Sequence, residues 1–286
     1  MLGPDDLVLC CGTVRQADLG ELIEVASANG FRGISLQPHL YRRARAAGHS
    51  DAELRHRLDD HGVEIAELDA LATWLPGTPD PRKLPPGFAR VMLETSAEDF
   101  FRIADALGGQ MLNVGQLFPG PFDRDAASES LARVCDGAAD HGLAVSLEFY
   151  PWSDVRDPAT ALAVVEGAER DNAGLMVDSW HLFRGVGDVG ALAEVPGRRV
   201  VGTQLNDAPA QAAPQVLKET LEDRRLPGEG DIDLVGIVRT LDAIGSRAPL
   251  GAEIYSKELA ALPAADAAAR VGDAMRALVA AARSGS

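Results

Sequence analysis

The chain has 286 residues, a length that suits one large α/β barrel or two ordinary domains. Hydrophobic residues make up 46% and charged residues 24%, which excludes a disordered chain because a full apolar core can form. The formal net charge of -16 repels nucleic-acid phosphates and anionic membranes. We therefore expect a small-molecule partner, with neither nucleic acid nor a membrane as a partner.

The cysteines and the N-terminal residues bear on the cellular compartment. Cys10, Cys11 and Cys135 show no CxxC spacing, so we expect buried and unpaired thiols. Asp5 and Asp6 make the N-terminus acidic, and no basic region precedes an apolar run, so no signal peptide is predicted. No apolar run reaches the roughly 18 residues that a membrane helix requires. These features predict a cytoplasmic protein.

Short apolar or β-branched runs alternate with amphipathic helical stretches along the whole chain. In chain order, strands are predicted at 7–11, 33–36, 63–71, 111–117, 144–149, 174–177, 200–205 and 250–255. Helices are predicted at 20–29, 97–107, 126–141, 159–170, 234–244 and 264–282. Asp157, which precedes Pro158, and Asp233 are expected to begin helices, because a carboxylate there accepts hydrogen bonds from free backbone N–H groups.

Eight β–α alternations in a chain of this length predict an α/β fold, a closed (β/α)8 TIM barrel that forms a single domain over residues 1–286. An open, doubly wound sheet is the alternative. Against it, the first strand–helix turn at 11–15 lacks the GxGxxG pattern that receives a dinucleotide. The Pro/Gly-rich segment 76–87 follows the third strand, so we expect an active-site lid there and not a domain boundary.

The last four predicted strands each end in a side chain with an oxygen ligand. These residues are Glu148, Asp178, Gln204 and Glu253. Because the carboxyl ends of barrel strands meet at one rim, we expect the four side chains to converge. Three carboxylates and an amide oxygen predict a divalent cation, Mn²⁺ in the first place, with Mg²⁺ or Co²⁺ as alternatives. The competing interpretation is that each group caps a helix or binds a loop.

Two polar residues close to these strand ends are further candidates for the active site. His181 follows Asp178 by three residues, so its imidazole is predicted to reach a substrate oxygen beside the cation. A hydrogen bond within the loop is the alternative role for His181. Asp207, which follows the seventh strand, is expected to bind substrate or to support the metal ligands.

Three other side chains are candidates for substrate binding. Arg225, next to Arg224, precedes the Gly-rich loop 226–233 and is expected to bind an anionic group of the substrate. A solvated charged turn is the alternative. Trp74 and Trp152 lie beyond the third and fifth strands, where they would form apolar walls for a sugar-like ring or simply pack their loops.

With these residues in place, the chain resembles the sugar-phosphate isomerase/epimerase superfamily, the xylose-isomerase-like barrels. The resemblance rests on the segments 147–148, 177–181, 204–207, 227–233 and 252–253. It implies that Glu148, Asp178, Gln204 and Glu253 bind the metal. It also implies that Glu148 and Glu253 act as acid and base on opposite faces of a ketose. Relatives are often dimers or tetramers, so a homo-oligomer is compatible with the resemblance.

Position 204 departs from the commonest pattern of the superfamily, in which many members carry His. Gln204, with the runs 178–181 and 207–209, is similar to the bacterial 3-dehydroshikimate dehydratases. DNA-repair endonucleases share the fold but bind several metals through additional histidines, and this acidic chain has only six His residues.

The resemblance predicts a divalent-metal-dependent isomerase or epimerase. It would act on a small keto sugar or related polyol through a metal-stabilised enediolate, with Glu148, Glu253 and His181 as catalytic residues. A metal-dependent dehydratase, a lyase acting on a cyclic keto acid or cyclitol such as 3-dehydroshikimate or inosose, stays open. A non-catalytic sugar-binding barrel is the third hypothesis.

Overall fold

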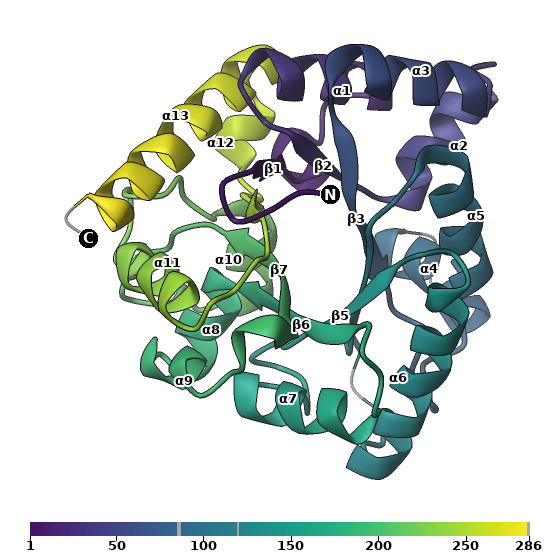
Figure 1. Ribbon diagram of the computed structural model, residues 1–286, viewed down its shortest axis with the longest axis vertical. Coiled ribbons are helices and arrows are strands. Elements are labelled where there is room, and N and C mark those ends of the chain that lie inside the picture. The colour runs from purple at the N-terminus through teal and green to yellow at the C-terminus, as the bar shows by residue number, and fades with distance from the viewer. Residues whose placement is uncertain (85–86, 119, 285–286) are drawn as a thin grey trace.

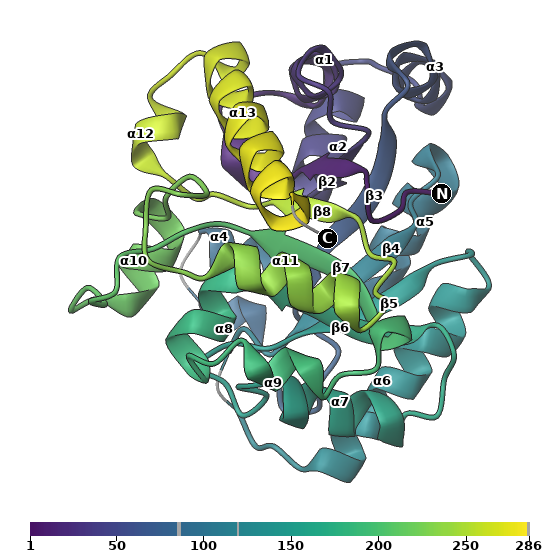
Figure 2. The ribbon, with the colours of Figure 1, turned by 60° about the vertical axis from the view of Figure 1, so that its left-hand side comes forward.

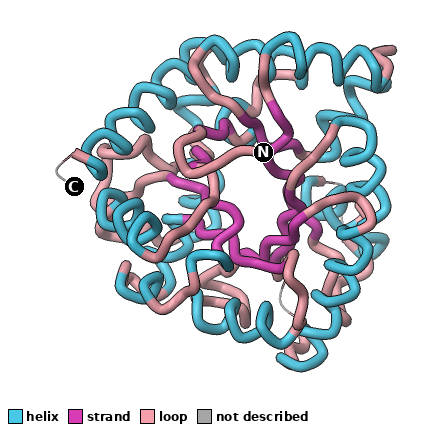
Figure 3. Tube along the Cα trace, viewed as in Figure 1, coloured by secondary structure: helices cyan, strands magenta, loops and turns pink. Residues whose placement is uncertain are grey.

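The computed structural model describes residues 1–84, 87–118 and 120–284. Within these residues, eight parallel strands close into one barrel in chain order, and β8 pairs with β1. The barrel lies inside a ring of helices (Figure 1), and the tube view separates strands from helices by colour (Figure 3). The strands are β1 Leu7–Leu9, β2 Gly33–Leu36, β3 Glu64–Leu71, β4 Met111–Gly115, β5 Ala144–Glu148, β6 Ala173–Asp178, β7 Val200–Leu205 and β8 Leu250–Ala252. The predicted (β/α)8 barrel is confirmed, and its closure excludes the doubly wound sheet.

The helices cover the outside of the barrel. The last helix, α13, packs against both α1 and α11 (Figure 2), which brings the first and last parts of the helical layer together. The helices are α1 Leu19–Ala28, α2 Pro38–Ala46, α3 Asp51–His61, α4 Phe88–Leu93, α5 Ala97–Leu107, α6 Arg124–Ala139, α7 Pro158–Gly167, α8 Ser179–Gly185, α9 Gly190–Ala193, α10 Val216–Glu222, α11 Leu234–Ala243, α12 Lys257–Ala260 and α13 Ala264–Arg283. The short 3₁₀ helices within the described ranges are η1 Cys11–Val14, η2 Pro81–Lys83 and η3 Gly197–Arg199.

The two predicted helix starts are confirmed by their hydrogen bonds. The carboxylate of Asp157 accepts from the backbone N–H of Thr160 at 2.7 Å, where α7 begins. Asp233 accepts in the same way from Gly236 at 2.8 Å, where α11 begins. In both cases the side chain satisfies an N–H group that the first helical turn leaves without a partner.

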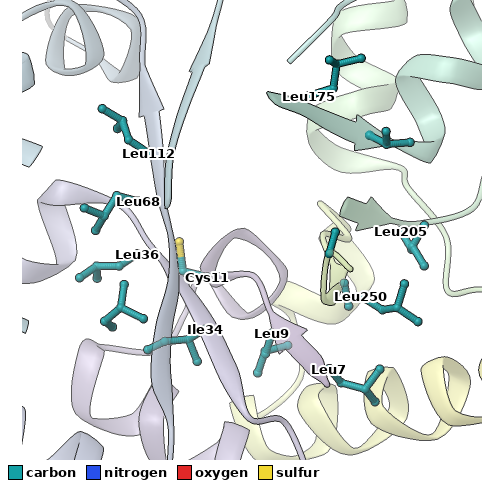
Figure 4. Packing of buried hydrophobic residues seen from close by; sticks show 14 of the residues in the cluster. Leu7, Leu9, Cys11, Ile34, Leu36, Leu68, Leu112, Leu175, Leu205 and Leu250 are labelled. Carbon is teal, nitrogen blue, oxygen red and sulfur yellow. The ribbon is translucent and has the colours of Figure 1, made fainter. Parts of the chain in front are cut away.

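The main apolar core lies between the outer faces of the strands and the helices. Leu36, Leu68, Leu112, Leu175 and Leu205 belong to this layer, as the close view shows (Figure 4). Successive side chains of a strand point to opposite faces. The residues next to these leucines therefore point into the barrel, and at the carboxyl ends of the strands many of them are polar.

Several predicted boundaries differ from the observed ones by a few residues. The first strand ends at Leu9 and not at residue 11, because the chain turns there into η1. The eighth strand ends at Ala252, so Glu253 lies just beyond it. Residues 85 and 86 of the predicted lid 76–87 lie outside the described residues, and the lid function stays a prediction. The helices α2 and α3, which follow β2, were not predicted.

The cysteines and the helices bear on the expectations about disulfides and membrane spans. Cys10, Cys11 and Cys135 are buried and unpaired, as expected. Within the described ranges, every helix is too short or too polar to cross a lipid bilayer.

Candidate metal centre and active site

The four predicted metal ligands come from the carboxyl ends of β5, β6, β7 and β8. Glu148 and Asp178 are the last residues of β5 and β6, and Asp178 is in register with Gln204 of β7. Gln204 is in turn in register with Gly251 of β8, and Glu253 follows two residues later. All four side chains are buried. The ends of four consecutive strands therefore carry three carboxyl groups and one amide, all shielded from solvent.

Glu148, Asp178 and His181 form the most compact group of donors. One ligand atom from each of the three residues lies within 4.8 Å of the others, a spacing at which they can hold a metal ion. Oδ1 of Asp178 accepts from the backbone N–H of His181 at 2.9 Å, because Asp178 is also the N-cap of α8. Nε2 of His181 lies 3.4 Å from Oε1 of Glu148. The strand-to-helix turn after β6 thus places the imidazole beside the two carboxylates.

Glu253 lies outside this group of three, and a buried arginine connects it to Asp178. Nη1 of Arg224 lies 2.8 Å from Oδ2 of Asp178 and 3.2 Å from Oε2 of Glu253. The guanidinium also donates a hydrogen bond from Nη2 to the hydroxyl of Thr220 of α10, at 2.8 Å. One cation of the chain itself therefore bridges two of the four predicted ligands.

Arg224, and not its neighbour Arg225, carries positive charge into the site. The Arg225 side chain is exposed, and its Nη1 donates to the carbonyl oxygen of Glu229 at 3.0 Å. The two side chains diverge because the backbone of Arg225 pairs with that of Asp207 in an isolated bridge. The predicted substrate contact of Arg225 thus has no support in its position.

Oε2 of Glu148 is fixed by two donors. It accepts from Nδ2 of Asn113 at 2.7 Å and from the hydroxyl of Tyr150 at 2.6 Å. Asn113 also donates to Oδ1 of Asp69 at 3.0 Å, and its own Oδ1 accepts from Ser146 at 2.8 Å. This buried network leaves Oε1 of Glu148 on the side of His181.

Only one end of the Gln204 amide makes a hydrogen bond among the described residues. Its Nε2 donates to Oε1 of Glu67 at 2.8 Å, from β7 to β3. Its Oε1 is buried and has no hydrogen-bond partner among the described residues. A buried acceptor without a donor is costly, and a cation would satisfy it. The residues present therefore fit a bound metal ion.

The electrostatics of the site also favour a cation. Five carboxyl groups are buried here with one guanidinium among the described residues, and they belong to Glu67, Asp69, Glu148, Asp178 and Glu253. Burial, with repulsion from Asp178 and Asp69, raises the pKa of Glu148 to about 8. Burial is also the main reason that the pKa of Glu67 and that of Glu253 lie well above their usual range. The site holds more acidic groups than its own arginine can balance.

The two basic groups of the site are perturbed in opposite directions. Burial lowers the pKa of His181 to about 3, against the opposing effect of Asp178, so the imidazole is neutral at physiological pH. Burial acts to lower the pKa of Arg224 as well, but the charges of Asp178 and Glu253 raise it above its usual value. Arg224 therefore supplies a permanent positive charge, and His181 supplies a neutral donor or acceptor.

Three aromatic rings enclose His181. Tyr150 and Trp180 meet it edge to face with ring centroids 4.7 and 5.3 Å away, and Trp152 does so at 5.3 Å. Trp152 is half-buried and stacks on Tyr150 at 5.2 Å. The predicted position of Trp152 beside the site thus agrees with its contacts, while its role as a substrate wall stays a prediction.

Trp74 and Asp207 lie in different surroundings. Trp74 is buried in the main apolar core, and among the described residues its Nε1 has no hydrogen-bond partner. The carboxylate of Asp207 accepts four backbone N–H groups at 2.8 to 3.0 Å, from Ala208, Gly228, Gly230 and Ile232. Asp207 therefore fixes the Gly-rich loop 226–233, and its oxygens are already occupied.

Sequence reasoning missed the contribution of the third and fourth strands. Glu67 and Asp69 lie two positions apart in a mostly apolar strand, so they share one face, and this spacing is a signal that was available. Asn113 is a single polar residue within β4. Arg224 stands next to Arg225, and the sequence does not show which of two adjacent arginines points inward.

Comparison with known proteins agrees with this architecture. A model of the xylose isomerase-like TIM barrel family matches residues 23–280. The 3-dehydroshikimate dehydratase of Pseudomonas aeruginosa is 32% identical over 137 residues, which make up 48% of this chain but only 22% of that protein. The inosose isomerase of Bacillus subtilis is 27% identical over 146 residues, 50% of this chain and 51% of that protein.

A solved structure extends the likeness over the whole barrel. The crystal structure of the IOLI protein with a bound zinc atom superposes with a TM-score of 0.83, covering 98% of this chain and 99% of that one at 21% identity. At that level of identity the likeness shows the fold alone. Since the family model spans most of the sequence and the strands close as that family requires, the chain belongs to the xylose isomerase-like TIM barrel family.

Proposed function

We propose that this protein is a divalent-metal-dependent isomerase or epimerase that moves a proton on the carbon next to the carbonyl of a small polyhydroxy ketone. The observation that carries the proposal is the convergence of Glu148, Asp178 and His181, with ligand atoms within 4.8 Å, in a buried site that holds an excess of carboxyl groups. Perturbed titratable groups gathered at the carboxyl end of a barrel are typical of catalysis.

Glu148, Asp178, Gln204 and Glu253 would hold the cation, which we take to be Mn²⁺, with Mg²⁺ or Co²⁺ as alternatives. A bound divalent cation supplies a Lewis acid that polarises a ketone and acidifies the neighbouring C–H bond. Three features support this assignment: the unpartnered Oε1 of Gln204, the excess of carboxyl groups, and the zinc in the structurally similar IOLI protein.

The two glutamates are suited to exchange protons with the substrate. Oε2 of Glu148 is held by Asn113 and Tyr150, and Oε2 of Glu253 is held by Arg224. Each carboxyl group thus has one anchored oxygen and keeps Oε1 for a proton. One glutamate would remove the proton from the carbon next to the carbonyl, and the other would return a proton to the opposite face.

His181 and Arg224 would act on the substrate oxygens. The neutral imidazole can donate a hydrogen bond to a hydroxyl or carbonyl oxygen, or accept one from a hydroxyl group, depending on which ring nitrogen carries its hydrogen. Arg224 would stabilise negative charge that develops on the substrate during proton removal. The surrounding aromatic rings would exclude water and so strengthen both interactions.

A six-membered ring ketone is the substrate class that the relatives favour. The two relatives are named for 3-dehydroshikimate and inosose, and both compounds are polyhydroxylated cyclic ketones. The half-buried face of Trp152 would pack against such a ring. We carry this substrate class to the present chain as part of the proposal.

Solvent exchange tests the proposal without knowledge of the product. The protein, with Mn²⁺, is incubated in D₂O with ketohexoses, inososes or 3-dehydroshikimate, and deuterium in the recovered substrate is measured by mass spectrometry. The proposal predicts incorporation at a carbon next to the carbonyl, lost on chelation and restored by Mn²⁺. Binding of a ligand with no exchange under either condition would instead support the non-catalytic barrel.

A dehydratase is the second candidate, and two observations favour it. The chain matches a 3-dehydroshikimate dehydratase over 137 residues, and position 204 holds Gln. In this case removal of a proton from carbon by one of the two glutamates would be followed by loss of the β-hydroxyl group. The same glutamate would pass that proton to the hydroxyl so that it leaves as water, and the neutral His181 would hydrogen-bond to the hydroxyl. The expected sign is a conjugated product that absorbs in the ultraviolet. No absorbance change with 3-dehydroshikimate or an inosose would exclude this reaction on those substrates.

A further inference from the structure

The bond between Gln204 and Glu67 crosses the inside of the barrel. The two residues are 137 positions apart, on β7 and β3, and both side chains are buried. It is the only hydrogen bond that the amide of Gln204 makes within the described residues. In the structure, Nε2 of Gln204 is the donor and Oε1 of Glu67 is the acceptor, at 2.8 Å.

This contact decides which end of the amide remains for another ligand. An amide has a donor end and an acceptor end of nearly equal size, and a metal ion binds only the oxygen. With the NH₂ group engaged by Glu67, Oε1 is left without a partner. If the amide were turned over, its oxygen would face Glu67 and its NH₂ group would take the place of Oε1, which would leave no amide oxygen for a cation.

We propose that Glu67 is a positioning residue for the metal centre, which fixes the amide of Gln204 so that its oxygen faces the cation. This inference rests on the proposed function, since it assumes a cation at the site. Glu67 does not itself bind the metal, and it acts through the orientation of one ligand. Replacement of a residue that hydrogen-bonds to a metal ligand typically lowers metal affinity by about 10- to 100-fold.

The test exchanges the two functional groups. Glu67→Gln keeps the size of the side chain but can both donate and accept, so it no longer selects one orientation of Gln204. Gln204→Glu places a second carboxyl group against Glu67. The double variant Glu67→Gln/Gln204→Glu restores one donor facing one acceptor and returns an oxygen to the cation. Mn²⁺ alone is titrated into each metal-free protein by calorimetry, and the spin resonance spectrum of the bound ion is recorded.

We expect Glu67→Gln to weaken Mn²⁺ binding by about 10-fold or more, and the double variant to recover most of that loss. Far-UV circular dichroism checks that each variant is folded. If Glu67→Gln does not fold, the comparison of Gln204→Glu with the double variant carries the test, and binding must be tighter in the double variant. Unchanged Mn²⁺ affinity in folded Glu67→Gln, or a double variant no better than the single variants, would overturn the role of Glu67.

Asp178→Asn separates this inference from the proposed function. If the wild-type protein binds Mn²⁺ and Asp178→Asn does not, the metal centre stands and the Glu67 variants report on orientation alone. If the wild-type protein fails to bind Mn²⁺, or Asp178→Asn binds it equally well, the metal centre is wrong and the role of Glu67 falls with it.

Discussion

Nη1 of Arg224 lies 2.8 Å from Oδ2 of Asp178, although the two residues are 46 positions apart. Both side chains are buried. The same nitrogen also donates to the backbone carbonyl of Glu253 at 3.1 Å. The guanidinium therefore joins the strand end of β6 to that of β8, and it partly balances the carboxyl groups between them.

Replacement of Arg224 should destabilise the metal-free protein. Arg224→Gln removes the guanidinium that balances Asp178 and Glu253, and the loss of one partner of a buried ion pair typically costs about 3–5 kcal/mol. Urea denaturation in the presence of a chelator measures the free energy of unfolding. Arg225→Gln is the matched control, because its side chain is exposed and should change this free energy by less than about 0.5 kcal/mol. If the two substitutions lowered the free energy of unfolding equally, the buried ion pairs of Arg224 would not have the stabilising role given to them here.

The stability of the metal-free protein should fall as the pH rises above neutrality. The pKa of Glu148 is raised in the folded state from 4.5 to about 8. A carboxyl group of this kind stabilises the fold fully below its unfolded pKa and loses that contribution as the pH rises through the folded value. His181 acts oppositely, because its pKa is lowered from 6.5 to about 3, and its contribution is lost only as the pH falls below 6.5.

Thermal unfolding between pH 6.5 and 8.5 measures this effect, since folded His181 stays neutral across that range while Glu148 titrates. We expect Tm to decrease with rising pH in the presence of a chelator. Mn²⁺ should bind more tightly over the same interval, by up to about 10-fold per pH unit for each proton released, because the ligands must be deprotonated. A metal-free Tm that rises toward pH 8.5 would contradict the raised pKa of Glu148.

Glu253→Gln should remove turnover and leave the fold intact. The substitution preserves the size of the side chain but removes the proton-exchanging oxygen, for which losses of about 10²- to 10⁴-fold are typical. The readout is the rate of deuterium incorporation into substrate, with Mn²⁺ binding and Tm measured beside it. Full exchange activity in this variant would exclude Glu253 from proton transfer.

Glu219→Gln should loosen α10 and thereby the arginine that it supports. Glu219 is buried and accepts from Nε1 of Trp180 at 3.0 Å and from Nε of Arg184 at 2.8 Å, so it ties α10 to α8. We expect a loss of about 3 kcal/mol in the free energy of unfolding, with faster hydrogen exchange in α10. Glu222→Gln, on the same helix but more exposed, is the control and should leave both quantities nearly unchanged.

Much of the barrel could be predicted because its strands are covered on both faces. Such strands appear in the sequence as short, continuous apolar runs, and those at 33–36 and 200–205 match the observed bounds. The convergence of Glu148 and Asp178 followed from the rule that function lies at the carboxyl ends of the strands. The ends of β1 and β8 were less predictable, because a 3₁₀ turn and a loop continue the apolar run.

The partners of the site residues could not be predicted, because they come from distant parts of the chain. Gln204 is oriented by Glu67, 137 positions away, and no local pattern connects them. The choice between Arg224 and Arg225 depends on how α10 and the bridge to Asp207 turn the backbone. Asp207 seemed available for substrate from its place after β7, but the loop 226–233 occupies its oxygens.

The proposed metal centre requires that oxygen donors from the last four strands bind one divalent cation together. Crystals grown with Mn²⁺ and measured at an X-ray energy where manganese scatters anomalously test it directly. We expect a single strong anomalous peak in coordination contact with Glu148, Asp178, Gln204 and Glu253. A peak elsewhere, or none at saturating Mn²⁺, would contradict it.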